Sequence, residues 1–165
     1  MILLCYDGSP DARAAVESAA ELFPGGSVKV LTVWQPFVEV VARTTVGFGM
    51  VPSIPDSEEI DDASSKTAEK TAAEGVELAR KLGLEAEPLT FAQTSTTARA
   101  ILGEADELDA SAIVMGSRGL TGVKSLLLGS VSHEVIQHAD RTVVVVPSPD
   151  VAASRAREIH EQASD

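Results

Sequence analysis

The stretch AIVMGSRGLTGVKSLLLGSVS, residues 112–132, joins a short apolar run to a string of glycines and serines. Residues 112–115 have the pattern of a buried strand, and residues 131–138 have the pattern of a helix. Phosphate groups bind where several backbone N–H groups converge and no Cβ atom blocks the approach, as at the N-terminus of a helix. The stretch therefore predicts a phosphate-binding site. Its candidate groups are Gly116, Arg118, Gly119, Gly129, Ser130 and Ser132.

The glycines alone are a weak indication, because most glycines only turn the chain or end a helix. The spacing Gly-x2-Gly-x9-Gly-Ser, however, lies between a strand and a helix, which is the context that a phosphate loop requires. It is not a Walker A loop, since no Gly-Lys-Ser or Gly-Lys-Thr follows, and it lacks the Gly-x-Gly-x-x-Gly spacing. Two members have simpler alternatives: Ser130 can cap the helix, and Arg118 can be a solvated surface residue.

On either side of this stretch, apolar runs alternate with helical patterns. Strands are predicted at residues 2–6, 28–34, 84–91, 112–115 and 142–146. Alternating strands and helices predict an α/β fold in which a parallel sheet is covered by helices on both faces. Pro88 favours an edge position for the third strand. Ligands of such folds bind beyond the carboxyl ends of the strands.

Two segments fall outside this alternation. Residues 36–56 contain several prolines and glycines and predict a long loop. Residues 148–165 are polar and predict a C-terminal tail outside the core. The domain is therefore expected to span residues 1–147.

A second polar loop, Asp7-Gly8-Ser9, follows the first strand. Ser9 is expected to cap the helix that begins at Pro10, and Thr96 or Thr97 is expected to cap a later helix. Asp7 has two interpretations, contact with a ligand or stabilisation of its own turn.

The glycine string and the strands around it resemble the universal stress protein family. The resemblance rests on the spacing Gly-x2-Gly-x9-Gly-Ser, on Asp7-Gly8-Ser9 and on Leu31-Thr32-Val33 in the second strand. It covers nearly all of residues 1–147. It implies a Rossmann-like three-layer α/β sandwich whose five-stranded, mainly parallel sheet has the order 3-2-1-4-5. The glycine string is the one that the ATP-binding branch of the family keeps.

Residue by residue, the resemblance implies how ATP, expected with Mg²⁺, would be held. Asp7, in the loop with Gly8 and Ser9, would face the ribose or a metal-bridged phosphate. Backbone groups of Thr32 and Val33 would meet the adenine edge, and Met115 would line the pocket. The phosphates would be held by Gly116, Arg118, Gly119, Gly129, Ser130, Val131 and Ser132.

Three features depart from the family pattern. Residues 36–56 are unusual, Asp140-Arg141-Thr142 replaces the common Cys-Pro before the last strand, and the tail is extended. These departures concern the adenine side and the tail rather than the glycine string.

Composition excludes several classes of partner. The chain has 25 acidic and 13 basic residues and a formal charge of −12, so nucleic acids and anionic membranes are not expected to bind. The single cysteine, Cys5, excludes an intrachain disulfide and a cysteine zinc cluster, and it is expected to be buried and inert. Protein ligands for a metal are not assigned. The N-terminus does not have the pattern of a signal peptide and no apolar stretch approaches about 18 residues, so a soluble, cytoplasmic protein is expected.

The last predicted strand, Thr142–Val146, consists entirely of β-branched residues. An exposed edge of this kind promotes association unless it is covered. The family resemblance implies that this strand pairs across a two-fold axis, so we expect a homodimer.

The leading hypothesis is an ATP-binding regulatory or stress-response protein with at most slow hydrolysis. No general base or residue that orients an attacking water can be named. One alternative is a nucleotide hydrolase or adenylyl-transfer enzyme, for which Asp7 is the candidate acid or base. Another is an interaction protein in which the nucleotide is structural or absent and residues 36–56 carry the function.

Overall fold

The computed structural model describes residues 1–44, 57–120 and 128–162, and within them five strands form one sheet. The strand order is β3-β2-β1-β4-β5, and every neighbouring pair is parallel. This arrangement confirms the expected fold class and strand order. The strands are β1 (Ile2–Cys5), β2 (Ser27–Trp34), β3 (Glu85–Ala92), β4 (Ala112–Gly116) and β5 (Thr142–Val146).

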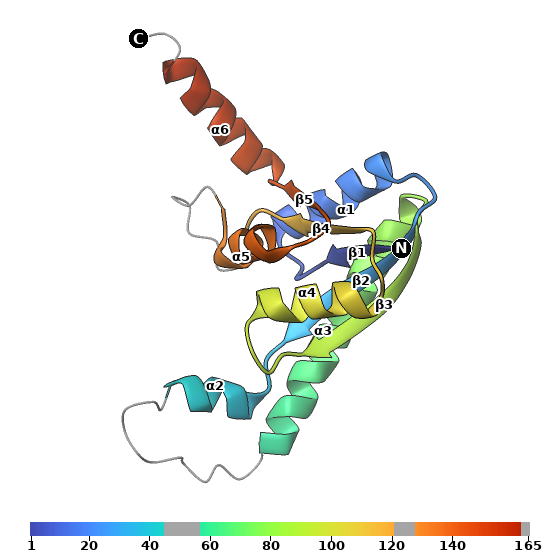
Figure 1. The fold of residues 1–165 in the computed structure, drawn as a ribbon, viewed down its shortest axis with the longest axis vertical. Helices are drawn as coiled ribbons and strands as arrows, with labels where there is room; N and C mark the ends of the chain where they lie inside the picture. Colours follow the sequence, from blue (N-terminus) through green and yellow to red (C-terminus); the bar gives the residue numbers. More distant parts are fainter. Residues whose placement is uncertain (45–56, 121–127, 163–165) are drawn as a thin grey trace.

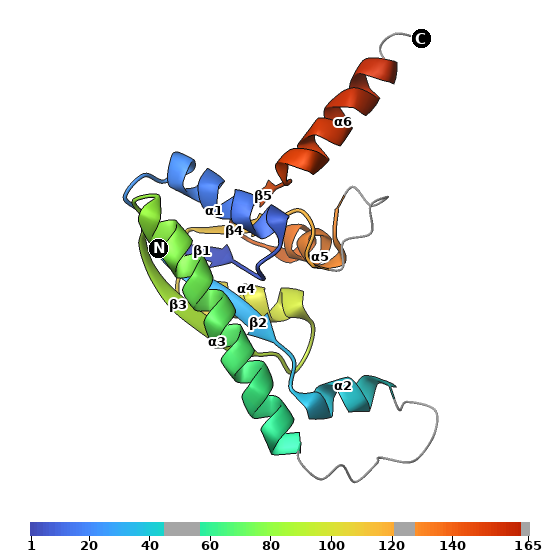
Figure 2. The same cartoon turned by 180° about the vertical axis from the view of Figure 1, so that it is seen from behind.

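Helices cover both faces of the sheet. Helices α1 and α3 pack on one face, and α4 and α5 pack on the other (Figures 1 and 2). The helices in the described part of the chain are α1 (Pro10–Leu22), α2 (Phe37–Thr44), α3 (Ser57–Lys81), α4 (Thr97–Glu107), α5 (Ser130–His138) and α6 (Pro149–Gln162).

The core has two layers because the sheet is buried on both sides. Leu3 and Leu4 of β1 are both fully buried, but Leu4 packs with α1 and α3 whereas Leu3 packs with α4 and α5. Successive side chains of a strand point to opposite faces, so a strand with two covered faces needs an unbroken apolar run. Pro88 lies in β3, at an edge of the sheet as expected.

The predicted helix caps are largely confirmed. Ser9 precedes α1, and its Oγ accepts a hydrogen bond from Ala12 N at 3.1 Å. Of the two threonines considered for α4, Thr96 is the cap, since its Oγ1 accepts from Arg99 N at 3.2 Å.

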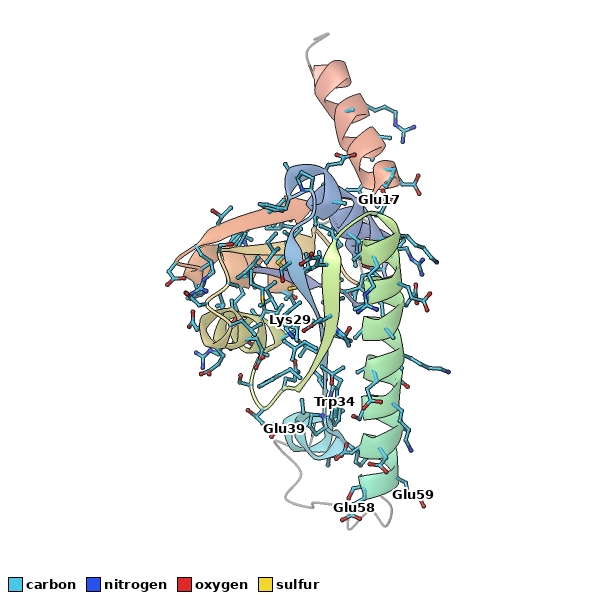
Figure 3. All side chains as sticks on the ribbon, turned by 90° about the vertical axis from the view of Figure 1, so that its right-hand side faces the viewer. Glu17, Lys29, Trp34, Glu39, Glu58 and Glu59 are labelled. Atoms are coloured by element: carbon cyan, nitrogen blue, oxygen red, sulfur yellow. The ribbon has the colours of Figure 1, made fainter. Side chains whose placement is uncertain are left out.

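The expected loop at residues 36–56 is wrong in its first part, because Phe37–Thr44 forms α2. Pro36 immediately precedes the helix, where a proline is tolerated. Asp61 of α3 accepts a hydrogen bond from Phe37 N at 2.6 Å and so satisfies a free N–H group at the helix start. Figure 3 labels Glu39 on this helix and Glu58 and Glu59 at the beginning of α3. The remainder, residues 45–56, lies outside the described residues.

The polar C-terminal segment contains a helix, α6, which extends away from the rest of the molecule (Figures 1 and 2). Val151 near its start is buried against the body. Among the described residues, no helix combines the length and the apolar character needed to cross a bilayer.

Arg141, which departs from the family pattern, supports the end of α4. Its Nη1 donates to the carbonyl oxygens of Ala105 at 2.6 Å and Ala110 at 3.0 Å. It also pairs with Asp106 and Asp140. The arginine thus joins the last turn of α4 to the turn that follows it, so the unusual residue has a structural role.

Candidate functional site

A cavity of about 600 Å³ lies at the carboxyl ends of the strands, beside the N-termini of α4 and α5. Strands β1 and β4 are neighbours, but the helix that follows β1 lies on one face of the sheet and the helix that follows β4 on the other. A crevice opens where the connections diverge in this way, and open α/β sheets bind their ligands there.

Most of the predicted site residues line this cavity. They are Asp7, Val33, Met115, Gly116, Arg118, Gly119, Gly129, Ser130, Val131 and Ser132. The other three predicted residues, Gly8, Ser9 and Thr32, do not line it and have structural roles. Gly8 makes the turn after β1 with a φ of +80°, which favours glycine, and Ser9 caps α1. Thr32 is buried and donates from Oγ1 to the Tyr6 carbonyl oxygen at 2.8 Å.

We call the part of the cavity formed by Gly116–Gly119 and Gly129–Ser132, with Asp7 and Asp11 behind it, the glycine end. Each glycine here allows the chain to pack closely on itself. A Cβ on Gly116 would lie 2.8 Å from Asp11 C, and one on Gly119 would lie 2.8 Å from Asp7 Oδ2. A Cβ on Gly129 would lie 3.2 Å from the Ser117 carbonyl oxygen. These three glycines are therefore needed for close packing within the loop. They are not needed for an unusual backbone conformation, because none of them adopts a left-handed φ.

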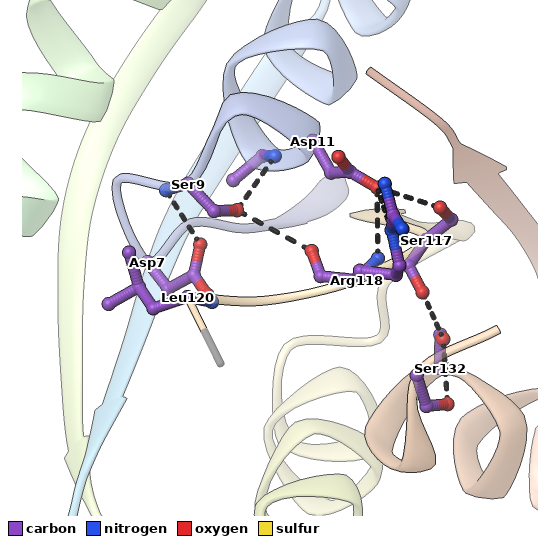
Figure 4. A network of polar contacts seen from close by, with 9 residues as sticks. Asp7, Ser9, Asp11, Ser117, Arg118, Leu120 and Ser132 are labelled. Atoms are coloured by element: carbon purple, nitrogen blue, oxygen red, sulfur yellow. Dashed lines mark hydrogen bonds and ion pairs between the residues drawn. The ribbon is translucent and has the colours of Figure 1, made fainter. Parts of the chain in front are cut away.

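Asp11 organises the glycine end, and the sequence analysis did not include it (Figure 4). Its Oδ2 accepts from Ser117 Oγ at 2.7 Å and from Arg118 N at 3.1 Å, and Arg118 Nε lies 3.8 Å away. Burial opposes ionisation of the carboxyl group, but hydrogen bonds from Ser117 and Ser148 and the charge of Arg118 outweigh it and lower the pKa of Asp11. The signal available in the sequence was an aspartate one helical turn before Ala15, on the buried face of α1.

Asp7 stabilises its own turn and also joins it to the loop after β4. Its Oδ1 accepts from Ser9 N at 3.0 Å, and its Oδ2 accepts from Leu120 N at 3.3 Å (Figure 4). A carboxylate oxygen can accept more than one hydrogen bond, so both oxygens keep acceptor capacity toward the cavity.

The N-terminus of α5 lines the cavity with backbone N–H groups. Gly129 occupies the N-cap position and has no side chain that could accept from the first N–H groups of the helix, so the alternative in which Ser130 caps α5 is wrong. The hydroxyl of Ser132 instead donates to the Ser117 carbonyl oxygen at 2.9 Å. The first turn of α5 thus contributes N–H groups that have no partner among the described residues, together with the positive end of the helix dipole.

The opposite part of the cavity, formed by Val33, Gln93 and Thr97, is here called the glutamine end. The Leu31 carbonyl accepts from Tyr6 N at 2.8 Å, on the side of β1. The Trp34 carbonyl accepts from Gln93 N at 2.9 Å, on the side of β3. Backbone groups of successive strand residues alternate between the two neighbours, so those of Val33 face the side on which β1 has already ended. Val33 therefore offers one donor and one acceptor at the crevice.

The wall of the cavity is largely apolar and includes residues that the sequence analysis missed. These are Cys5, Tyr6, Ala12, Leu31, Gln35, Gln93, Thr97, Ile101 and Leu120. Burial, and secondly the negative charge of Asp7, raise the pKa of the Cys5 thiol to about 12, which agrees with the expectation of an inert cysteine. Single apolar or amide residues carry no motif, so no pattern in the sequence could have identified them.

Comparison with known proteins places the chain in one family. Residues 1–147 match the model of the universal stress protein family. The universal stress protein YxiE of Bacillus subtilis is 33% identical over 147 residues, which cover 88% of this chain and 97% of that protein.

Solved structures share the fold. The universal stress protein UspA from Lactobacillus plantarum superposes with a TM-score of 0.65 at 20% identity, covering 88% of this chain and 95% of that one. The universal stress protein from Archaeoglobus fulgidus in complex with dAMP superposes with a TM-score of 0.57 at 25% identity, with the same coverage of 88% and 95%.

Proposed function

The chain belongs to the universal stress protein family, and we propose that it is an ATP-binding regulatory member that holds the nucleotide in the cavity at the carboxyl ends of the strands. The observation that carries the proposal is that one cavity contains two sets of backbone groups without a partner among the described residues. The first turn of α5 supplies N–H groups at the glycine end, and the backbone of Val33 supplies a donor and an acceptor at the glutamine end.

The glycine end suits the phosphates. Free N–H groups and the helix dipole attract anions, and Arg118 lines the same wall. The net charge of −12 acts over longer distances, where salt screens it, so it does not prevent an anion from binding to local donors. The volume of about 600 Å³ lies within the usual range for small-molecule sites.

The glutamine end suits the adenine ring. Adenine presents a ring-nitrogen acceptor next to its 6-amino donor, which is complementary to one backbone N–H and one C=O. Backbone groups of Thr32 face β3 in the alternation described above, so we assign the adenine edge to Val33 alone. The dAMP complex of the Archaeoglobus fulgidus relative is consistent with an adenine nucleotide as ligand.

Mg²⁺ would enter as the counter-ion of the nucleotide. In the described part of the chain, no group of three His, Cys, Asp or Glu side chains could hold a metal ion alone. Asp7 is the one carboxylate among the described residues that line the cavity. Since Mg²⁺ usually keeps several waters and binds phosphates with one or two carboxylates, Asp7 would be its protein ligand.

A regulatory role fits the side chains around the cavity better than rapid catalysis. Its described lining contains no histidine and no second carboxylate that could take a proton from an attacking water. Binding without efficient turnover allows the protein to respond to the nucleotide as a signal. We further propose that residues 1–147 form the nucleotide-binding domain of a cytoplasmic homodimer, paired through the edge strand β5.

Calorimetry of the full chain with ATP, ADP, AMP and cyclic AMP, with and without Mg²⁺, tests the proposal. We expect ATP to bind at micromolar concentration or below, and more tightly with Mg²⁺. If none of the four nucleotides binds in this range, the proposal is wrong.

A matched pair of glycine substitutions tests the site. In Gly119→Val the new side chain would displace Asp7 and block the glycine end, so ATP affinity should fall about tenfold or more. Gly103→Val is the control, because a Cβ at that exposed position of α4 meets no atom within 4 Å. Thermal unfolding of both variants checks that the fold is retained. Unchanged affinity in Gly119→Val would mean that the glycine string only turns the chain.

A further inference from the structure

Gln93 is a buried polar residue whose side chain is only partly satisfied. It follows β3 directly, lines the cavity and is 1% exposed. Its Oε1 accepts from Thr97 Oγ1 at 2.6 Å, at the start of α4. Its Nε2 is buried and has no hydrogen-bond partner among the described residues.

An unpaired buried donor lowers the stability of the protein that contains it, because the group has lost its water and gained nothing in return. Native structures keep few such groups, and each one calls for an explanation. Here the unpaired amide belongs to the wall of a cavity, beside backbone groups of Val33 that face the same space. A ligand that brings an acceptor would satisfy it.

We propose that Gln93 determines the base specificity of the site, by donating a hydrogen bond from Nε2 to a ring nitrogen of a purine. The inference rests on the proposed nucleotide binding and goes beyond it. It names a residue that hydrogen-bonds to a second edge of the base, in addition to the edge assigned to Val33. A purine carries ring-nitrogen acceptors on more than one edge, so Val33 and Gln93 can each meet one. A pyrimidine ring in a nucleotide has at most one nitrogen acceptor, N3 of cytosine, and in uracil and thymine that nitrogen is a donor, so the site favours purines.

The surroundings of Gln93 make this contact effective. Leu31, Val33 and Ile101 line the same cavity, and a hydrogen bond in an apolar environment is stronger than one in water. Thr97 holds the amide oxygen in place, so the nitrogen is directed without a further loss of side-chain freedom.

The test compares the wild type with Gln93→Met, which keeps the length of the side chain but removes the donor. Calorimetry is done with ATP and with 1-deaza, 3-deaza and 7-deaza ATP, each of which lacks one ring nitrogen. In the wild type, one of the three analogues should bind about 3- to 10-fold more weakly than ATP because of the lost contact with Gln93. In Gln93→Met, ATP should weaken by a similar factor, and that analogue should bind as well as ATP does.

Two controls separate recognition from a structural role. Gln137→Met removes an exposed amide on α5, outside the cavity, and should leave all affinities unchanged. The variant Gln93→Met with Thr97→Val removes both partners of the existing side-chain bond, so the ligand-free protein should unfold at the same temperature as the wild type or a higher one. A merely structural glutamine would instead lower the unfolding temperature and weaken ATP and all three analogues equally.

The outcomes also separate this inference from the proposed function. If the wild type binds ATP but Gln93→Met binds it equally well, Gln93 does not read the base and the inference is wrong. The inference is also wrong if every deaza analogue that binds more weakly than ATP to the wild type still binds more weakly than ATP to Gln93→Met. If the wild type binds no nucleotide, both the proposed function and the inference are wrong.

Discussion

The two ends of the cavity differ in how far the protein satisfies the polar side chains that it places there. At the glycine end, Asp11 and Ser132 each have protein partners at hydrogen-bond distance. At the glutamine end, the backbone N–H and C=O of Val33 face the crevice beyond the end of β1. The buried amide nitrogen of Gln93 has no partner among the described residues. The side chains at the glycine end are therefore held by the protein before a ligand binds. At the glutamine end, the amide nitrogen of Gln93 would gain a partner from a ligand.

This difference suggests a division of labour. A loop held by its own hydrogen bonds needs little reorganisation when phosphates bind, so the glycine end contributes affinity for any nucleotide. Unpaired groups at the glutamine end discriminate between bases, because a wrong base leaves them unsatisfied. Variants at each end should therefore have different effects.

Asp11→Ala should have the largest effect on the glycine end. It removes the acceptor for Ser117 and Arg118 and leaves the fully buried Ser117 hydroxyl without its partner. We expect a loss of about 3 kcal/mol in the free energy of unfolding, measured by urea denaturation. Glu17→Ala, an exposed position on the same helix (Figure 3), is the control and should change stability by less than about 0.5 kcal/mol. Equal stability of both variants would show that the glycine end is not held by Asp11.

Acid titration should show a smaller effect of the same carboxyl group. The pKa of Asp11 in the folded protein lies below its ordinary value of 3.8, so its contribution to stability is present above that pH and is lost as the pH falls through the lowered value. Asp11→Asn should be less stable than the wild type at pH 7, and the difference should shrink below about pH 3.8. A difference that stays constant over this range, in urea denaturation at each pH, would contradict the lowered pKa.

Cys5 provides the mildest test, which concerns the apolar wall of the cavity. A thiol with a pKa of about 12 is almost entirely protonated at pH 8, so iodoacetamide should alkylate Cys5 at less than about 1% of the rate seen in urea-unfolded protein. Mass spectrometry measures both rates. Alkylation at the rate of a free thiol would contradict the raised pKa of Cys5.

The sequence predicted the central strands β1 and β4 well because they are buried on both faces and read as apolar runs. The strand order came from the family resemblance, since alternating elements alone do not state which strands are neighbours. Helix α2 was missed because the prolines on either side suggested a loop, while the carboxylate that supports its start, Asp61, is 24 residues away from Phe37.

The site was predicted only where it carries a motif. Asp11 and its partner Ser117 are separated by 106 residues, so neither side chain could be assigned before the fold was known. Gln93 follows an edge strand and has no characteristic neighbours in the sequence. Its importance arises only from what the fold places around it, which is an apolar wall and one hydroxyl group.

The C-terminal helix shares an anchor with the glycine end. Ser148, the residue before α6, donates to Asp11 from both its hydroxyl and its backbone N–H. The helix has 14 residues and is therefore about 21 Å long. A rotation of about 10° at Ser148 would carry the far end of the helix through about 4 Å, given that length. The position of the far end of α6 therefore depends in part on the contacts of one carboxylate, Asp11, at the glycine end.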